Sequence, residues 1–344
     1  MTDPISDADR RSSLLAAKIR VLVDRRWGDA ADATPGSFPS GATLVDERGG
    51  RAWVLVDADG ERRLGGALAI AARAGVGELH VIIDDPVAAG IVARRAGQFA
   101  SPPLVWRSEG PDLHPVGSAP PAADPPPPPE AELYRPVLVA AGLDPVVEGG
   151  VLSGELHGLE VGCVVVQPDG AAHVEAGVGR FDREASAMMF AELGEADSLA
   201  RAVDIVRGYR HAGAERHPLN QLVPERWLRA VVVAHPELVG AAELRAVGSA
   251  VPRPNLTADG VATAVGTDQA GDPVVVVCST GVNLDLVPAA ADDRLTHCPD
   301  ARLILAVPER DAVPITTDLA VLLSDPAEVM AVTGDWRSVA DRSR

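Results

Sequence analysis

The sequence predicts an α/β to α+β protein in which two similar ββαβαβ units flank a central αβββααα module, with an amphipathic helix at the N-terminus. Two observations lead to this prediction. Short runs of Val, Leu and Ile alternate with longer stretches of helical periodicity, and the order of elements in residues 41–117 recurs in residues 259–335. The chain has 344 residues, which is more than the ~150 residues typical of one domain. Because 47% of the residues are hydrophobic but only 3% are aromatic, the cores must be mainly aliphatic.

Residues 1–27 are predicted to form a basic amphipathic helix, whose apolar residues recur at helical spacing. The helix is strongly basic, whereas the whole chain has a net charge of -18. An isolated helix of ~20 residues is marginal in water, so it needs a surface to pack on. We expect that surface to be protein, either the acidic body of the same chain or a second copy. An anionic membrane or a nucleic acid is the alternative. The residues expected to make the contact are Leu15, Ile19, Leu22, Arg10, Arg11 and Arg20.

The first ββαβαβ unit spans residues 41–117 and follows a predicted loop at residues 28–40. Its opening hairpin is indicated by Gly49-Gly50 between two β-type runs. The predicted elements are strands 42–46 and 51–57, helix 63–74, strand 78–84, helix 86–99 and strand 104–107. Residues 118–130 contain five consecutive prolines and are predicted to be a stiff linker in the polyproline II conformation.

The central α+β module spans residues 131–258. Pro168-Asp169-Gly170 marks a turn between its last two strands. The predicted elements are helix 131–141, strands 146–148, 151–166 and 172–178, and helices 182–193, 196–210 and 224–235. Residues 246–258 contain two prolines and are predicted to be a linker.

The second ββαβαβ unit spans residues 259–335. Its predicted elements are strands 262–266 and 273–279, helix 284–295, strand 302–307, helix 315–323 and strand 328–332. An offset of 220 residues aligns the two opening hairpins without a gap, and an offset of 224 aligns the third strands. This repetition predicts an internal duplication. The alternative is that two small α/β units share a pattern by chance.

The best polar cluster lies in the central module. If 151–166 is one strand and 168–170 is a hairpin tip, four side chains share one sheet face: Glu155, His157, His173 and Glu175. Imidazole and carboxylate groups of this kind form sites for a divalent metal. The alternative is a solvated polar face, for which substitution of Glu155 or His173 changes stability by no more than ~0.5 kcal/mol. We expect the solvated face.

Two analogies of topology bear on this module. Metal-dependent nucleases carry an acid-x-Lys signature on a strand, but the nearest strings here, Glu160-Val161-Gly162 and Glu175-Ala176-Gly177, end in glycine. The same element order is similar to that of small chaperone-like modules that hold a partner on a sheet. Both likenesses concern topology alone, so neither assigns a function.

Composition excludes several classes of activity. A chain with a net charge of -18 repels phosphate backbones, so general nucleic-acid binding is not expected. Lys18 is the only lysine, which excludes chemistry that needs a lysine outside the N-terminal helix. Three widely spaced cysteines, Cys163, Cys278 and Cys298, predict buried thiols in a reducing compartment. No targeting or membrane-spanning segment is evident, which predicts a cytoplasmic location.

The sequence therefore favours a soluble cytoplasmic binding or scaffold protein without an identifiable catalytic motif. We expect a protein partner or self-association and no membrane. The alternative function is a metal-dependent hydrolase, nuclease-like in topology, that holds a divalent metal with the Glu/His cluster of the central module.

Overall fold

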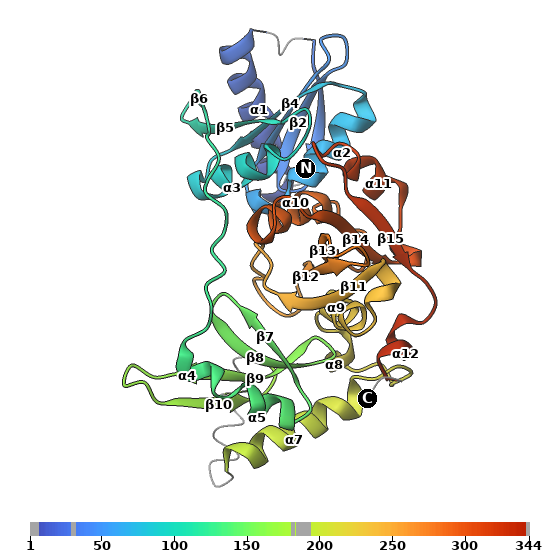
Figure 1. Ribbon diagram of the computed structural model, residues 1–344. Coiled ribbons are helices and arrows are strands. Elements are labelled where there is room, and N and C mark those ends of the chain that lie inside the picture. The colour runs from blue at the N-terminus through green and yellow to red at the C-terminus, as the bar shows by residue number, and fades with distance from the viewer. Residues whose placement is uncertain (1–6, 29–31, 180–182, 184–193, 342–344) are drawn as a thin grey trace. The chain divides into compact units, whose positions relative to one another are not determined.

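The computed structural model describes residues 7–28, 32–179, 183 and 194–341. The protein is a mixed α/β protein, and the described residues form three sheets (Figure 1). This confirms the predicted mixed α/β class and, with α1 (Asp7–Trp27), the predicted N-terminal helix. The chain divides into two compact units. Unit 1 contains residues 1–121, 287–292 and 314–327, and unit 2 contains residues 122–286, 293–313 and 328–344.

Unit 1 is built on a six-stranded sheet in the order β1-β2-β3-β4-β5-β6. Strands β3, β4 and β5 are parallel, and the other neighbours are antiparallel. The strands β1 and β6 were not predicted; β1 lies within the segment expected to be a loop. The strands are β1 (Thr34–Phe38), β2 (Gly41–Asp46), β3 (Arg51–Val56), β4 (Glu78–Ile83), β5 (Leu104–Glu109) and β6 (Asp112–Pro115).

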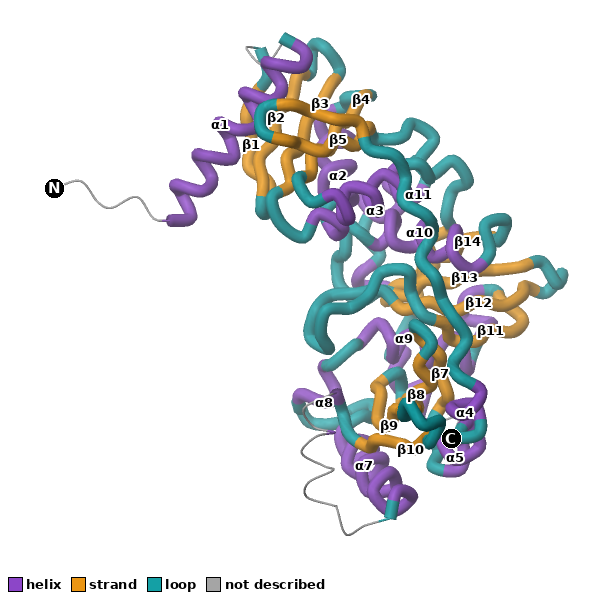
Figure 2. The backbone as a smooth tube through the Cα atoms, turned by 90° about the vertical axis from the view of Figure 1, so that its left-hand side faces the viewer, coloured by secondary structure: helices purple, strands orange, loops and turns teal. Residues whose placement is uncertain are grey.

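The N-terminal helix α1 (Asp7–Trp27) covers one face of this sheet (Figure 2). Its residues Leu15, Ile19 and Leu22 are buried with Trp53 and Leu55. The alternating residues of β3 and β4 point to the opposite face, where α2 (Leu64–Ala74) and α3 (Pro86–Ala96) follow their strands. A right-handed crossover places both helices on that face. The expected partner surface of the apolar stripe is therefore a sheet of the same chain.

The basic residues of α1 bind acidic residues of unit 1. Arg11 pairs with Asp57, and Lys18 pairs with Asp84. Arg25 Nε lies 2.9 Å from an Asp112 carboxylate oxygen. Of the other predicted contact residues, Arg10 is exposed and Arg20 is half-buried. The helix thus joins the acidic body of its own chain by both apolar and ionic contacts.

Unit 2 contains a four-stranded antiparallel sheet in the order β10-β9-β8-β7, where three strands were predicted. The strands are β7 (Asp144–Glu148), β8 (Val151–Leu156), β9 (Leu159–Val166) and β10 (Ala172–Ala176). The helices α4 (Pro129–Glu132), α5 (Arg135–Ala140) and α7 (Glu195–Tyr209) complete its core (Figure 1). The helix predicted at 182–193 lies outside the described residues, except for Arg183.

The predicted single strand 151–166 is wrong because the chain reverses at His157-Gly158. Both residues have positive φ, 47° and 73°, and Leu156 pairs with Leu159. A two-residue turn with positive φ at both positions is the type I′ turn that suits the twist of a hairpin. Gly158 is required for a second reason: a Cβ atom there would lie 2.2 Å from the backbone of Arg226.

The third sheet, also in unit 2, has the order β11-β12-β13-β14-β15. Its strands are β11 (Ala241–Val247), β12 (Ala262–Asp268), β13 (Pro273–Cys278), β14 (Arg302–Pro308) and β15 (Glu328–Val332). The helix α9 (Pro224–Ala234) packs on one face of it through Trp227, Leu228 and Val231. The remaining helices are α8 (Pro218–Gln221) and α12 (Trp336–Asp341) in unit 2, α11 (Pro314–Ala320) in unit 1, and α10 (Leu286–His297), of which residues 287–292 belong to unit 1. The strand β11 and the helix α12 were not predicted.

The first and third sheets share an order of elements. The order helix-β-β-β-α-β-α-β runs from α1 to β5 and again from α9 to β15. The pairing directions also agree: two antiparallel pairs are followed by two parallel pairs in each. His80 pairs with Leu104, and Ile304 with Glu328, so β4 and β5 match β14 and β15 at one offset of 224. The hairpins do not align without a gap, because the turn between β12 and β13 is longer by one residue.

Two features of the predicted linkers also differ from expectation. The helix α4 begins at Pro129, inside the predicted linker 118–130. A Cβ atom on Gly150 would lie 3.2 Å from Pro125, so this part of the linker packs against the β7–β8 turn. Across the residues that the structure covers, no helix has the length and hydropathy needed to cross a membrane.

Candidate functional site

Unit 2 contains a cleft of about 410 Å³ that is lined by parts of the chain far apart in sequence. Its volume lies in the range of small-molecule sites. The residues that line it come from 122–124, the β7–β8 turn, α9, the segment 248–261 between β11 and β12, and α10. The polar side chains among them are Asp124, Glu148, Arg226, Ser249, Arg253 and Thr296.

The segment 248–261 forms one wall of the cleft and is held by many contacts. Arg253 binds Glu225, and Asn255 Oδ1 accepts hydrogen bonds from the backbone of Thr257 and Ala258 at 3.0 and 2.8 Å. Leu256 packs against the core of the four-stranded sheet. A long connection packed by its own side chains is often functional. The segment predicted as a linker at 246–258 is therefore an ordered loop that packs against the rest of unit 2.

Asp293 of α10 binds the first residues of this wall. Its carboxylate is fully buried and accepts hydrogen bonds from the hydroxyls of Ser249 and Thr263 and from the backbone N–H of Ala250. Four residues further along α10, His297 donates Nε2–H to Gly248 O at 2.7 Å. Burial raises the pKa of Asp293 to about 6, although the hydrogen bonds oppose the rise.

Asp293 is expected to make the free energy of unfolding fall as the pH rises from 3.8 to 6. In that interval the folded protein holds a proton that the unfolded chain, with an ordinary pKa of 3.8, has released. The two pKa values differ by an amount worth about 3 kcal/mol. Chemical denaturation of the wild type and of Asp293→Asn across this interval should show the difference between their stabilities changing by that amount. The exposed substitution Asp169→Asn is the control, and parallel wild-type and Asp293→Asn curves would refute the expectation.

A buried ionic network forms the floor of the cleft. Arg229 Nη2 donates to both carboxylate oxygens of Glu155, at 2.7 and 2.8 Å, and its Nη1 donates to Glu148 at 3.0 Å. Arg226 donates to the same two carboxylates. Burial alone would raise the pKa of Glu148, but the charges of Arg229 and Arg226 hold it below its ordinary value. The network ties β7 and β8 to α9.

A second buried arginine fixes the approach to α9. Arg210 is fully buried and donates Nε–H to His157 O at 2.9 Å and Nη1–H to Leu219 O at 2.8 Å. Its guanidinium lies 4.7 Å from the ring centre of Trp227, on which His157 also stacks. Burial lowers the pKa of Arg210 to about 9. Arg210 therefore holds the β8–β9 turn and α8 together, and it is not one of the residues that line the cleft.

The four predicted metal ligands are not brought together. Glu155 is bound to Arg229, and His157 lies in the β8–β9 turn against Trp227. His173 pairs with Val165, which lies six residues along β9 from Leu159. About 20 Å of strand therefore separates His173 from the turn that holds His157. His173 and Glu175 lie 3.7 Å apart on a partly exposed face. His173 lies opposite Val165 and Glu175 opposite Cys163, which agrees with the hairpin tip predicted at 168–170.

Within the described ranges, no three His, Cys, Asp or Glu side chains are placed to hold a metal ion. The thiols are also poor nucleophiles. Burial raises the pKa of Cys163 to about 11 and that of Cys278 to about 12, so neither is a thiolate near neutral pH.

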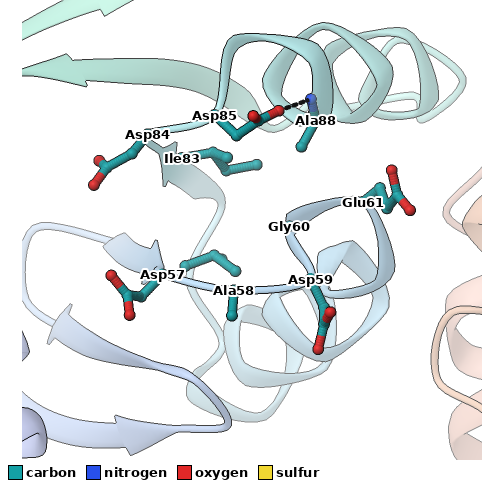
Figure 3. Close-up of a pocket in the computed structure, with 10 residues that line it drawn as sticks. Asp57, Ala58, Asp59, Gly60, Glu61, Ile83, Asp84, Asp85 and Ala88 are labelled. Atoms are coloured by element: carbon teal, nitrogen blue, oxygen red, sulfur yellow. Dashed lines mark hydrogen bonds between the residues drawn. The ribbon is translucent and has the colours of Figure 1, made fainter.

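A smaller cleft, of about 290 Å³, lies in unit 1 at the carboxyl ends of β3 and β4. Figure 3 shows the carboxylates of Asp57 and Asp59 after β3 and those of Asp84 and Asp85 after β4. Each has a partner in its own unit: Arg11 binds Asp57, Arg63 binds Asp59, Lys18 and Ser108 bind Asp84, and Asp85 caps α3 at Ala88 N. Asp57 and Asp84 thus hold α1, whereas Asp59 and Asp85 make contacts local to their own loops.

No known protein family, curated protein or solved structure matches this chain. The site must be judged from its own geometry. Sequence reasoning pointed to Glu155 but missed Asp124, Arg226, Thr296 and Asp293. The available signal was the length of segment 248–261, which contains Pro, Asn and Gly residues. It connects β11 to β12, whereas the corresponding connection of the first sheet, between β1 and β2, consists of Pro39 and Ser40 alone.

Proposed function

We propose that the protein is a non-catalytic binding protein and that the cleft of unit 2 is its ligand site. The observation that carries this proposal is the insertion at 248–261. The first and third sheets share their order of elements, and the third departs from the first at the wall of the cleft. Function commonly resides in loops that are added to a stable scaffold.

The chemistry of the cleft supports binding over catalysis. The hydroxyl of Ser249 is bonded to Asp293, and Nε2–H of His297 is bonded to Gly248 O. Both side chains therefore serve to hold the wall. Arg226 and Glu148 are fixed by the buried network, which makes the site preorganised. The rival hypothesis of a metal-dependent hydrolase has no observation in its favour, since Glu155, His157, His173 and Glu175 are dispersed.

The test is to fill the cleft and follow ligand binding. A fragment library screened by ligand-detected NMR should yield binders to the wild type. Ala123→Trp, which places a large side chain on the cleft lining, should abolish their signals, while Ala171→Trp in the exposed β9–β10 turn should leave them unchanged. Equal binding to Ala123→Trp and the wild type, with both proteins folded, would refute the location of the site.

We also propose that the two ββαβαβ segments arose by internal duplication. Support comes from three contacts inside unit 1. Phe99 pairs with Leu323, Ala100 N donates to Leu322 O at 2.9 Å, and Ser324 N donates to Gln98 O at 2.9 Å. Phe99 and Leu323 are 224 positions apart. The same offset relates Gln98 to Leu322 and Ala100 to Ser324, so the two hydrogen bonds are reciprocal, as in a two-fold interface between identical subunits. The same offset relates β4 and β5 to β14 and β15.

A cytoplasmic location and a protein partner or self-association remain predictions. The apolar face of α1, which the sequence favoured as the contact surface, packs on the sheet of its own unit. A partner, if bound, would have to meet another surface.

A further inference from the structure

We infer that the ligand of the unit 2 cleft is a small organic cation that carries a primary ammonium group, with Asp124 as its counter-ion. This inference rests on the proposed ligand site and adds the chemical class of its ligand. Two properties of the cleft support it: the balance of charge around the cleft, and the hydrogen-bonding capacity that the chain leaves unused there.

Among the described residues, Asp124 is the carboxylate of the cleft lining that no arginine or lysine matches. Glu148 and Glu155 are matched by Arg226 and Arg229, and Arg253 is matched by Glu225. These ion pairs lie in the floor and the wall of the cleft. Among the described residues, no arginine or lysine lies within 4.0 Å of Asp124. With a neutral His297, the net charge of the cleft is therefore negative.

Asp124 also has unused acceptor capacity. Its carboxylate accepts one long hydrogen bond, from Gly149 N at 3.4 Å, within the part of the chain that the structure describes. A carboxylate has about four acceptor positions. The nearest side chain of basic type is His297, whose Nδ1 lies 3.9 Å from Asp124 Oδ2. Nε2–H of that ring is donated to Gly248 O, so in the neutral form of the imidazole Nδ1 is a second acceptor that faces the carboxylate.

The same cleft offers a third acceptor. Thr296, the neighbour of His297 in α10, lines the cleft, and its buried Oγ1 has no hydrogen-bond partner among the described residues. A buried polar atom without a partner is costly, so it points to a group that would satisfy it. A primary ammonium has three N–H donors and no acceptor, which matches Asp124, His297 and Thr296. The net charge of -18 also favours the approach of a cation.

The experiment compares three probes of the same chain length on the full-length protein: butylamine, trimethylbutylammonium and butyrate. Titration followed by NMR should show binding of butylamine, much weaker binding of trimethylbutylammonium, which cannot donate, and no binding of butyrate. Asp124→Asn should weaken butylamine at least about tenfold, which equals about 1.4 kcal/mol. Thr296→Val should weaken it severalfold, and Asp169→Asn, in an exposed turn, should not change it.

Three results would overturn the inference: butylamine fails to bind, butyrate binds as tightly, or Asp124→Asn binds butylamine like the wild type. The folded state of each variant is checked by its thermal unfolding. These failures are distinguishable from failure of the proposed function. Suppose that fragments bind the wild type and not Ala123→Trp, but that none of them is an amine. The cleft would then remain a ligand site, and only the ammonium class would be rejected.

Discussion

Replacing Arg229 with methionine is expected to lower the free energy of unfolding of unit 2 by about 3–5 kcal/mol. The guanidinium is 1% exposed and donates to Glu155 and Glu148. Removing it leaves the Glu155 carboxylate, which is 3% exposed, with only the longer contact to Arg226 at 3.3 Å. An uncompensated buried charge costs far more than the lost attraction alone, because water no longer solvates it. Chemical denaturation of the variant measures the loss.

A double-mutant cycle separates this cause from simple loss of packing. Glu155→Met combined with Arg229→Met should cost less than the sum of the two single substitutions, because the double variant leaves no unpaired charge between these positions. Arg302→Met is the matched control, since its pair with Glu328 is about half exposed and contributes at most about 1 kcal/mol. Additive single effects would contradict the assignment of Glu155 and Arg229 as one unit.

The expected size of this effect corrects the sequence prediction for Glu155. A solvated sheet face allows a change of no more than ~0.5 kcal/mol, but Glu155 is buried in the network. For His173, whose side chain is 40% exposed, a change of no more than ~0.5 kcal/mol remains a prediction. The difference arises at His157-Gly158. Reading 151–166 as one strand carried the alternation of faces across a position where the chain turns back.

Local patterns predicted those parts of the fold that depend on neighbouring residues. The strands that were predicted in the two mixed sheets are short apolar runs, and their bounds agree with the prediction within a few residues. The Pro168-Asp169-Gly170 turn fixed the pairing of β9 with β10 correctly. The apolar stripe of α1 was also identified. Strands β1 and β11 escaped prediction because they contain Pro35 and Gly36 or charged residues, and edge pairing, not local propensity, makes them strands.

The cleft could not be predicted in the same way. Asp124, Glu148, Arg226 and Thr296 come from four separate parts of the chain, and no local spacing links them. Their proximity follows from the packing of α9 against β7 and β8 and from the course of segment 248–261. The predicted metal cluster failed for the converse reason: its residues are near in sequence, but the hairpin separates them.

Deleting residues 1–27 is expected to abolish the cooperative unfolding of unit 1. The helix α1 buries one face of the six-stranded sheet, and its removal exposes Trp53, Leu55 and Ile82 to water. A helix that contributes several fully buried aliphatic side chains supplies more stabilisation than a small domain has in excess. The graded version is Ile19→Ala, which should cost about 2–5 kcal/mol because Ile19 is completely buried.

The matched control for Ile19→Ala is Leu14→Ala on the same helix, since Leu14 is 64% exposed and its truncation should change stability by no more than about 0.5 kcal/mol. Tryptophan fluorescence reports the docking, because Trp27 at the end of α1 lies 5.6 Å from Trp53 and 5.5 Å from Trp106, measured between ring centres. If α1 instead served a second molecule, both variants would unfold like the wild type and lose only association. Loss of stability in Ile19→Ala at low protein concentration, with no change in Leu14→Ala, assigns the apolar face of the helix to its own sheet.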